Sequence, residues 1–231
     1  MIRAVVFDVD FTLIHPGPTF QATGYQAFST RYGIVVDPAR FPAAVASASS
    51  LLDLPDDTPY ADEIHVRYTR HILEAMGGTG DRLDDCAREI YREWAVCHHF
   101  DLYDDVSAAL GDLVTRGILV GLVSNSHRSL DQFQRHFGLD GLIAASVSSA
   151  EHGMMKPHPS IFEAALEKLA VPASTSLMVG DSVSHDVEGA LRAGMNAALL
   201  HRPDVPHPRE AELVARGVPV LRTLRDLPRL L

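Results

Sequence analysis

Residues 2–13 read IRAVVFDVDFTL, and this stretch decides the fold. Its first eight residues, Ile2–Val9, are nearly all apolar, several of them are β-branched, and the acids Asp8 and Asp10 mark the end of the run. A nearly continuous apolar run of this kind is typical of a strand that is buried on both faces of a parallel sheet. The stretch therefore predicts a central strand with acidic side chains at its carboxyl end.

Similar short apolar runs recur only after residue 117, and helical patterns lie between them. The predicted strands are Ile118–Val123, Leu142–Val147, Leu177–Val179 and Ala197–Leu200, and the predicted helices are Asp105–Arg116, Ser129–Phe137, Pro159–Leu169 and Val183–Ala193. Strands that alternate with helices form right-handed βαβ units. We therefore expect an α/β domain whose parallel sheet is covered on both faces, with the first strand central.

Residues 16–99 differ from the rest of the chain because they hold helical patterns and no convincing strand. These patterns cover Thr19–Tyr32, Pro38–Leu52, Pro59–Met76 and Asp81–Cys97. Sequences rich in proline, aspartate and glycine separate several of them and indicate turns. We expect residues 1–15 and 100–231 to form the α/β core, and residues 16–99 to form an inserted all-helical domain.

The composition limits the classes of function. The 231 residues are 46% hydrophobic, enough for a sizeable core, and they carry a formal charge of −10. The excess of acids disfavours nucleic acid or an anionic membrane surface as a partner. No apolar run is long enough to span a bilayer, and two cysteines without a CxxC pair are typical of the reducing cytoplasm. We expect a soluble cytoplasmic protein, and the sequence leaves its oligomeric state open, a homodimer included.

Polar side chains lie near the ends of the predicted strands. They are Asp8, Asp10 and Thr12 after the first strand, Ser124 and Asn125 after the second, Lys156 before the helix that follows the third, and Asp181 and Asp186 after the fourth. Ligands of open parallel sheets bind outside the carboxyl ends of the strands. We therefore expect all these groups to converge on one rim of the sheet.

Several carboxylates on one rim repel one another unless a cation is present. Oxygen ligands select a hard cation, and Mg²⁺ is expected because few carboxylates hold it together with water and substrate phosphate. The hydroxyl and backbone amides at Ser124 and Asn125 suit phosphoryl oxygens, and Lys156 supplies positive charge. A carboxylate nucleophile, a second carboxyl group two residues on, a metal ion and a lysine make a phosphoryl-transfer site.

The four groups of strand-end residues, which begin at Asp8, Ser124, Lys156 and Asp181, resemble in order and spacing the four motifs of the haloacid dehalogenase (HAD) superfamily of hydrolases. A DxDxT string alone is a weak signal, but four motifs in order, each at a strand end, are specific. The resemblance extends across the chain and implies a HAD-like, Rossmann-like core, with residues 16–99 as the helical type 1 cap domain. Tyr32–Gly33, Trp94 and Val179–Ser182 look closest to the REG-2-like branch of the family.

The resemblance also implies a role for each acidic residue. Asp8 is expected to be the nucleophile that becomes an aspartyl phosphate. Asp10 is expected to protonate the leaving alkoxide and then to activate water as a base. The implied Mg²⁺ ligands are the Asp8 carboxylate, the backbone carbonyl of Asp10, and Asp181. Asp186 is implied either as a further ligand or as an acid just behind the ligands, and Lys156 balances the charge as a catalytic residue.

Thr12, Ser124 and Asn125 are expected to bind the substrate, a small phosphomonoester of metabolism that the enzyme hydrolyses with Mg²⁺. The resemblance leaves three alternatives: a 2-haloacid dehalogenase, a phosphomutase and a non-catalytic phosphate-binding or interaction protein. Asp10 argues against the dehalogenase, because halide leaves without a proton and needs no acid there. Phe11 departs from the family pattern, in which glycine is commonest, and it is expected to narrow the site or to alter the hairpin that follows. The natural substrate, and the cap residues that select it, cannot be inferred from the sequence.

Overall fold

The computed structural model describes residues 1–231, and the chain divides into two compact units. One unit comprises Met1–His15 together with Leu102–Leu231, and the other comprises Pro16–Asp101. The strands β2 (Ile14–Pro16) and β3 (Phe100–Leu102) pair with each other where the chain leaves and re-enters the first unit.

The first unit is built on a six-stranded sheet in the order β5-β4-β1-β6-β7-β8. Its strands are β1 (Ala4–Phe7), β4 (Leu119–Ser124), β5 (Ala145–Ser148), β6 (Ser176–Gly180), β7 (Asn196–Leu200) and β8 (Val220–Leu221). Every neighbouring pair is parallel. The four residues of β1 are completely buried, and β1 lies between β4 and β6. The prediction of a parallel α/β sheet with the first strand inside it is confirmed.

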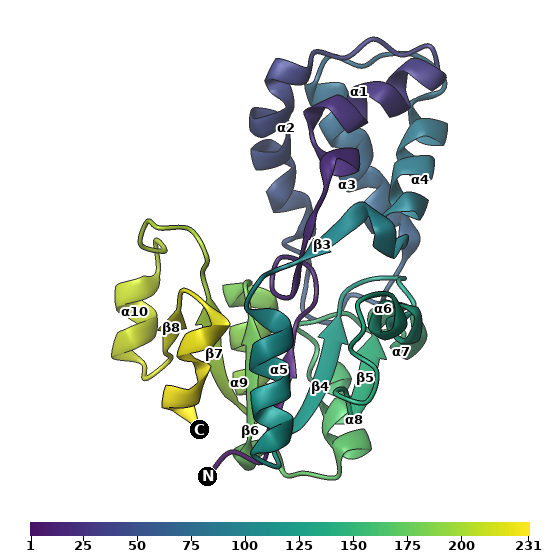
Figure 1. Ribbon diagram of the computed structural model, residues 1–231. Helices are drawn as coiled ribbons and strands as arrows, with labels where there is room; N and C mark the ends of the chain where they lie inside the picture. Colours follow the sequence, from purple (N-terminus) through teal and green to yellow (C-terminus); the bar gives the residue numbers. More distant parts are fainter. The chain divides into compact units, whose positions relative to one another are not determined.

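Helices cover both faces of this sheet (Figure 1). They are α5 (Val106–Thr115), α6 (Leu130–His136), α7 (Ser149–His152), α8 (Pro159–Leu169), α9 (Gly189–Arg192) and α10 (Glu210–Ala215), with the π-helical turn η6 (Val183–Glu188) and the 3-10 segments η5 (Ala173–Thr175) and η7 (Leu224–Leu230). The single helix predicted over Val183–Ala193 is therefore a π-helical turn followed by α9. The sequence analysis did not predict β8, α10 or η7.

One face of the sheet is packed into a continuous apolar core. Ala4 and Val6 of β1 belong to the same buried cluster as Ile161 and Phe162 of α8 and Val187 of η6. Burial of each large side chain of this kind contributes about 1.5–3 kcal/mol relative to leaving it in water. This packing holds the strand ends in fixed positions, which is what a site at the rim of the sheet requires.

The second unit is helical. It contains α1 (Ala22–Arg31), α2 (Phe41–Ala48), α3 (Asp62–Ala75) and α4 (Leu83–Glu93), with the 3-10 turns η1 (Pro18–Phe20), η2 (Pro38–Arg40), η3 (Ser49–Leu52) and η4 (Cys97–His99). Apolar residues such as Ile72 and Leu73 of α3 form its interior, in which Cys86 and Cys97 are buried as free thiols. None of the helices in the chain has the length and apolar character needed to cross a bilayer.

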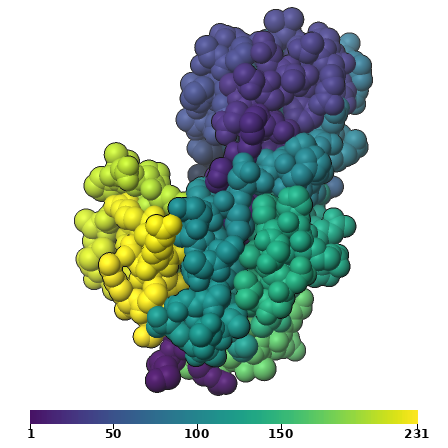
Figure 2. Space-filling model, viewed as in Figure 1, coloured from purple at the N-terminus to yellow at the C-terminus, as the bar shows by residue number.

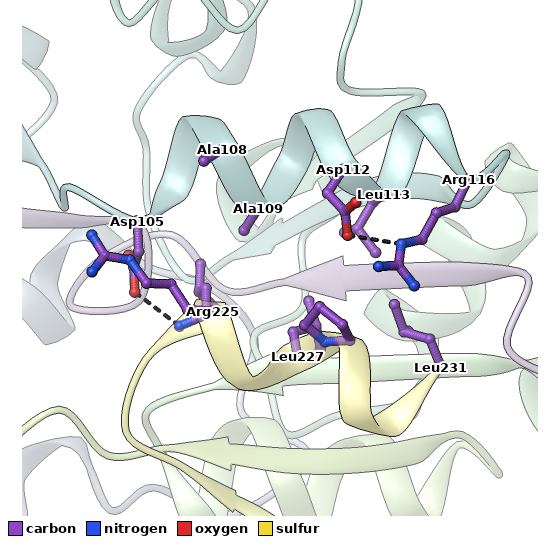
Figure 3. Close-up of a pocket in the computed structure, with 11 residues that line it drawn as sticks. Asp105, Ala108, Ala109, Asp112, Leu113, Arg116, Arg225, Leu227 and Leu231 are labelled. Atoms are coloured by element: carbon purple, nitrogen blue, oxygen red, sulfur yellow. Dashed lines mark hydrogen bonds and ion pairs between the residues drawn. The ribbon is translucent and has the colours of Figure 1, made fainter.

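The C-terminal residues lie beside α5 (Figure 2). Between α5 and η7 is a cavity of about 300 Å³ (Figure 3), whose lining includes Ala109 and Leu113 of α5 and Leu227 of η7. None of the strand-end residues singled out above lines this cavity. The candidate site is therefore defined by the side chains at the rim of the sheet and not by this hollow.

Candidate active site

Three of the four acids predicted to converge, Asp8, Asp181 and Asp186, do so at the ends of β1 and β6. In the register of the sheet, Phe7 of β1 lies opposite Val179 of β6, and the backbone N–H of Asp8 donates to the Val179 carbonyl at 3.0 Å. Asp8 therefore leaves β1 beside the end of β6, where Asp181 begins the next loop. One carboxylate oxygen each of Asp8, Asp181 and Asp186 lie within 4.8 Å of one another.

Lys156 lies inside this cluster. Its Nζ atom is 2.5 Å from Oδ1 of Asp8 and 2.7 Å from Oδ1 of Asp186. Only 3% of the Lys156 side chain is exposed. A buried ammonium group is tolerated when carboxylates compensate its charge and accept its protons. The two ion pairs therefore join the motif around Lys156 to both acidic motifs.

The backbone of Lys156 is fixed by Asn125. The Asn125 side-chain amide donates to the Lys156 carbonyl at 2.9 Å, and the Lys156 N–H donates to Oδ1 of Asn125 at 2.7 Å. Both ends of one amide side chain thus bind one residue. The sequence analysis predicts Asn125 as a substrate-binding residue, and the geometry adds a contact that positions Lys156.

Asp186 is placed by the π-helical turn η6. The backbone N–H of Ser182 donates to Oδ2 of Asp186 at 2.9 Å, and the Ser182 hydroxyl caps the turn by accepting from the His185 N–H. π-Helical turns are rare and occur frequently at functional sites. Asp186 is 1% exposed, so its carboxylate is held by Ser182 on one oxygen and Lys156 on the other.

The electrostatics of the cluster show a deficit of positive charge. Burial raises the pKa of Asp8 from 3.8 to about 7, and the nearby Asp186 adds to this effect while Lys156 opposes it. Burial, followed by the charges of Asp8 and Asp186, also raises the pKa of Asp181 well above its usual range. Burial alone would lower the pKa of Lys156, but Asp186 and Asp8 raise it above its ordinary value. One lysine therefore does not neutralise three carboxylates.

These residues fit a divalent cation. Asp8, Asp181 and Asp186 offer oxygen ligands close enough to share one ion, and hard cations such as Mg²⁺ select oxygen ligands. A cation there would stabilise the ionised forms of Asp8 and Asp181, which burial and mutual repulsion disfavour. The acidic cluster can thus hold a metal ion.

The side chain of Asp10 has a different partner. Nη1 of Arg128 donates to both carboxylate oxygens of Asp10, each at 3.0 Å. The Arg128 side chain is fully buried, and 18% of the Asp10 side chain is exposed. The sequence analysis missed Arg128, because an arginine in a loop carries no signal of burial.

The predicted hydroxyl groups lie in the same region of the fold. Thr12 is completely buried, and its Oγ1 atom has no hydrogen-bond partner. The hydroxyl of Ser124, which is also buried, donates to Oγ of Ser126 at 3.0 Å. A buried hydroxyl without a partner is costly unless a ligand satisfies it. This property of Thr12 suits a residue that binds a ligand.

A second residue missed by the sequence analysis, Arg202, fixes the loop after β1. Its Nη2 atom donates to the Thr12 carbonyl at 2.8 Å, and its guanidinium also pairs with Asp105 and lies 3.7 Å from the centre of the Tyr103 ring. Burial alone would raise the pKa of Asp105, but hydrogen bonds from Arg202 and Thr223 lower it below its ordinary value. Arg202 follows β7, so the strand-end rule could have found it.

Comparison with known proteins assigns this chain to a family. A family model described as haloacid dehalogenase-like hydrolase matches residues 2–194. The chain belongs to this family. The HAD-like fold expected from the four motifs is thereby confirmed, and the chain is a hydrolase.

Individual relatives agree with this assignment. Haloacid dehalogenase-like hydrolase domain-containing protein 3 of Danio rerio is 27% identical over 98% of this chain and 95% of its own length. Phosphoserine phosphatase of Thermus thermophilus is 31% identical over 66% of this chain and 60% of its own length. The magnesium-bound structure of the putative HAD-hydrolase YfnB from Bacillus subtilis has the same fold, with a TM-score of 0.73, 19% identity and coverage of 99% of this chain and 98% of that one.

Phe11 keeps the turn of this HAD hydrolase intact in spite of its size. Its φ of 63° lies in the left-handed region that glycine adopts without strain. Its N–H donates to the Ile14 carbonyl at 2.7 Å, and the side chain is 46% exposed. The backbone therefore follows the conformation that explains a preference for glycine, and the phenyl group is partly in solvent.

Proposed function

We propose that this protein is a Mg²⁺-dependent phosphatase that hydrolyses a small phosphomonoester through an aspartyl-phosphate intermediate. A carboxylate oxygen of Asp8 attacks phosphorus while the bond from phosphorus to the leaving oxygen breaks. Asp10 gives its proton to that oxygen, so the product leaves as a neutral alcohol. Asp10 then takes a proton from water as the water oxygen attacks phosphorus, which releases inorganic phosphate and restores Asp8.

The observation that carries this proposal is the second carboxyl group, Asp10, two residues after Asp8 and on the same loop. Cleavage of an alkyl phosphate needs a proton donor, because an alkoxide is a poor leaving group, and a positioned carboxyl group is a common donor. The name of the Thermus thermophilus relative, phosphoserine phosphatase, supports the same class of substrate.

The remaining residues have supporting roles in this proposal. Asp8, Asp181, Asp186 and the Asp10 carbonyl would hold Mg²⁺, which would supply positive charge to the phosphoryl group. Lys156 orients the Asp8 carboxylate through the contact that it makes there. The hydroxyl groups of Thr12 and Ser124 bind phosphoryl oxygens. In this proposal the helical unit, Pro16–Asp101, is the cap domain that selects the substrate.

The test is phosphate release from p-nitrophenyl phosphate and from a panel of phosphorylated metabolites, with Mg²⁺ and with EDTA. Wild type is expected to be active only with Mg²⁺, and the Asp8→Asn variant is expected to lose at least about 10⁴-fold, since no nucleophile remains. The Lys168→Gln variant is the control, because Lys168 contacts the Ser146 carbonyl on the surface and not the acidic cluster.

Three results would each contradict the proposed phosphatase mechanism. Activity retained by Asp8→Asn would contradict the aspartyl-phosphate mechanism. Chloride release from 2-chloropropionate without phosphate release would identify a dehalogenase. A wild-type protein that binds phosphate and turns over no member of the panel would favour a binding protein.

A further inference from the structure

Arg128 is the most unusual charged residue of the α/β unit. Its side chain is fully buried, and it is the largest side chain in the chain with less than 2% exposure. Arginine is almost never buried to this extent unless a partner compensates its charge. Here Nη1 of Arg128 donates to both oxygens of Asp10. A costly buried charge is therefore placed against the carboxylate to which we assign proton transfer.

The backbones on both sides of this contact are fixed. Asp10 lies in a turn closed by hydrogen bonds from the Leu13 and Ile14 N–H groups to the Val9 carbonyl, at 2.8 and 3.1 Å. Arg128 follows β4, which pairs in parallel with β1, and it directly precedes Ser129, whose side chain caps α6. The loops that carry Asp10 and Arg128 thus leave adjacent strands at the same edge of the sheet.

With both backbones fixed, the remaining freedom of Asp10 is the rotation of its side chain. A partly exposed aspartate at a rim can adopt several rotamers. A guanidinium nitrogen that bonds both carboxylate oxygens favours one rotamer and one plane of the carboxylate. Proton transfer requires the donor to be within hydrogen-bond reach of the leaving oxygen, and small displacements of a catalytic group cost large factors in rate.

We propose that Arg128 is a positioning residue that holds the Asp10 carboxyl group in the orientation needed for proton transfer to the leaving group. The proposal rests on the phosphatase function argued above and deepens it, because it assigns a role to a residue outside the four motifs. Arg128 touches neither substrate nor metal in this account. Its effect on the reaction passes through Asp10.

The leaving group provides the test, because a substrate with an acidic leaving group depends little on a proton donor. We compare p-nitrophenyl phosphate with phenyl phosphate, whose leaving phenol is the weaker acid and needs protonation more. The Arg128→Met variant is expected to lose about 100-fold in kcat/KM on phenyl phosphate and less than about tenfold on p-nitrophenyl phosphate. We compare kcat/KM because it covers only the steps up to transfer of the phosphoryl group to Asp8, whereas hydrolysis of the aspartyl phosphate, in which Asp10 also acts, is the same step for both substrates.

The Arg128→Lys variant keeps a positive charge with a different shape, and it is expected to restore part of the activity on phenyl phosphate. If Arg128→Met does not fold, Arg128→Lys alone tests the positioning role, through its losses on the two substrates. Arg135→Met is the matched control, because Arg135 is an exposed arginine on the adjacent helix α6. This control is expected to match wild type on both substrates.

A double-variant cycle separates positioning from general disturbance of the site. In an Asp10→Asn background, Arg128→Lys is expected to leave the ratio of the two kcat/KM values unchanged, since the group that it positions is no longer a proton donor. Equal losses of kcat/KM on both substrates in the Arg128 variants, or a further change of the ratio in the Asp10→Asn background, would overturn the positioning role while wild type and Asp8→Asn still supported the phosphatase. A wild-type protein inactive on both substrates would overturn the phosphatase function and this proposal together.

Discussion

The carboxylate of Asp186 occupies the space that a side chain at Gly180 would need. A Cβ atom on residue 180 would lie 2.2 Å from Oδ2 and 2.7 Å from Cβ of Asp186. Contacts that close are never tolerated, and Asp186 has little room to move because Lys156 and Ser182 hold its two oxygens. Gly180 is thus required because Asp186, six residues later, fills the space beside it.

We therefore expect Gly180→Ala to displace Asp186. Loss of a residue at or next to a metal site typically costs about 10- to 100-fold in metal affinity or activity, and we expect losses of this size in kcat/KM and in Mg²⁺ affinity measured by titration calorimetry. Gly111→Ala is the control, because a Cβ atom on Gly111 of α5 would meet nothing within 4 Å. Wild-type Mg²⁺ affinity in Gly180→Ala would contradict the role given to Asp186.

Asp8 is expected to make the metal-free protein less stable as pH rises. Its pKa is about 7 in the folded state against 3.8 for an ordinary aspartate. The unfolded chain therefore loses this proton first, and the free energy of unfolding falls between about pH 4 and pH 7. Asp8→Asn cannot ionise, so in EDTA at pH 8 it is expected to be more stable than wild type, by about 2–4 kcal/mol.

Urea unfolding of both proteins in EDTA from pH 4 to pH 8 checks this prediction. The two unfolding free energies are expected to approach each other at the acid end and to separate as pH rises. Added Mg²⁺ is expected to stabilise wild type more than Asp8→Asn, because the ion binds the folded state through the missing carboxylate. Parallel pH profiles in EDTA would contradict the idea that the buried Asp8 carboxylate is destabilising.

Substitution of Asp10 is expected to have the opposite effect on stability. Asp10→Asn removes the carboxylate charge that faces the buried guanidinium of Arg128, although the amide oxygen can still accept one hydrogen bond. We expect a loss of about 1–3 kcal/mol in the free energy of unfolding. Asp112→Asn is the control, because the Asp112–Arg116 pair is about half exposed on both sides and such pairs contribute at most about 1 kcal/mol.

Chemical denaturation at pH 7 in EDTA measures the three proteins side by side. A decrease for Asp10→Asn together with an increase for Asp8→Asn would show that two acids of one motif, two residues apart, have opposite effects on the fold. Equal stability of Asp10→Asn and wild type would mean that the Arg128 pair adds nothing to stability.

The positions of Asp8, Lys156 and Asp186 could be inferred from the sequence for a geometric reason. All parallel strands end at one edge, so polar residues at those ends must gather there whatever the details of packing. Arg128 could not be inferred in the same way. Its burial depends on how residues distant in the sequence pack around it, Asp10 among them, and a local sequence pattern does not encode that packing. Arg202 follows the end of β7, so the same strand-end rule also points to it, but the predicted site residues came from the first four strands only.

The elements that were missed are short or irregular. β8 has two residues, Val220 and Leu221, and hydrophobic periodicity cannot be read from two positions. The region predicted as one helix over Val183–Ala193 begins as a π-helical turn, which sequence periodicity does not distinguish from an α-helix. In both cases contacts with distant residues accompany the local structure: β8 pairs with β7, and Asp186 of the turn accepts from Lys156.

The left-handed backbone at Phe11 gives the last prediction. An L-residue with a Cβ atom pays roughly 1–2 kcal/mol in this region, and glycine does not. Phe11→Gly and Phe11→Ala both lack the phenyl group, so they differ only in the Cβ atom. We therefore expect the glycine variant to be more stable than the alanine variant by about 1 kcal/mol. The opposite order of stability is expected in the helix α5, where Gly111→Ala is expected to raise the free energy of unfolding by about 0.5–1 kcal/mol relative to Gly111. Thermal or urea unfolding measures both pairs, and an alanine variant at position 11 as stable as the glycine variant would contradict the strained turn at the start of the active-site loop.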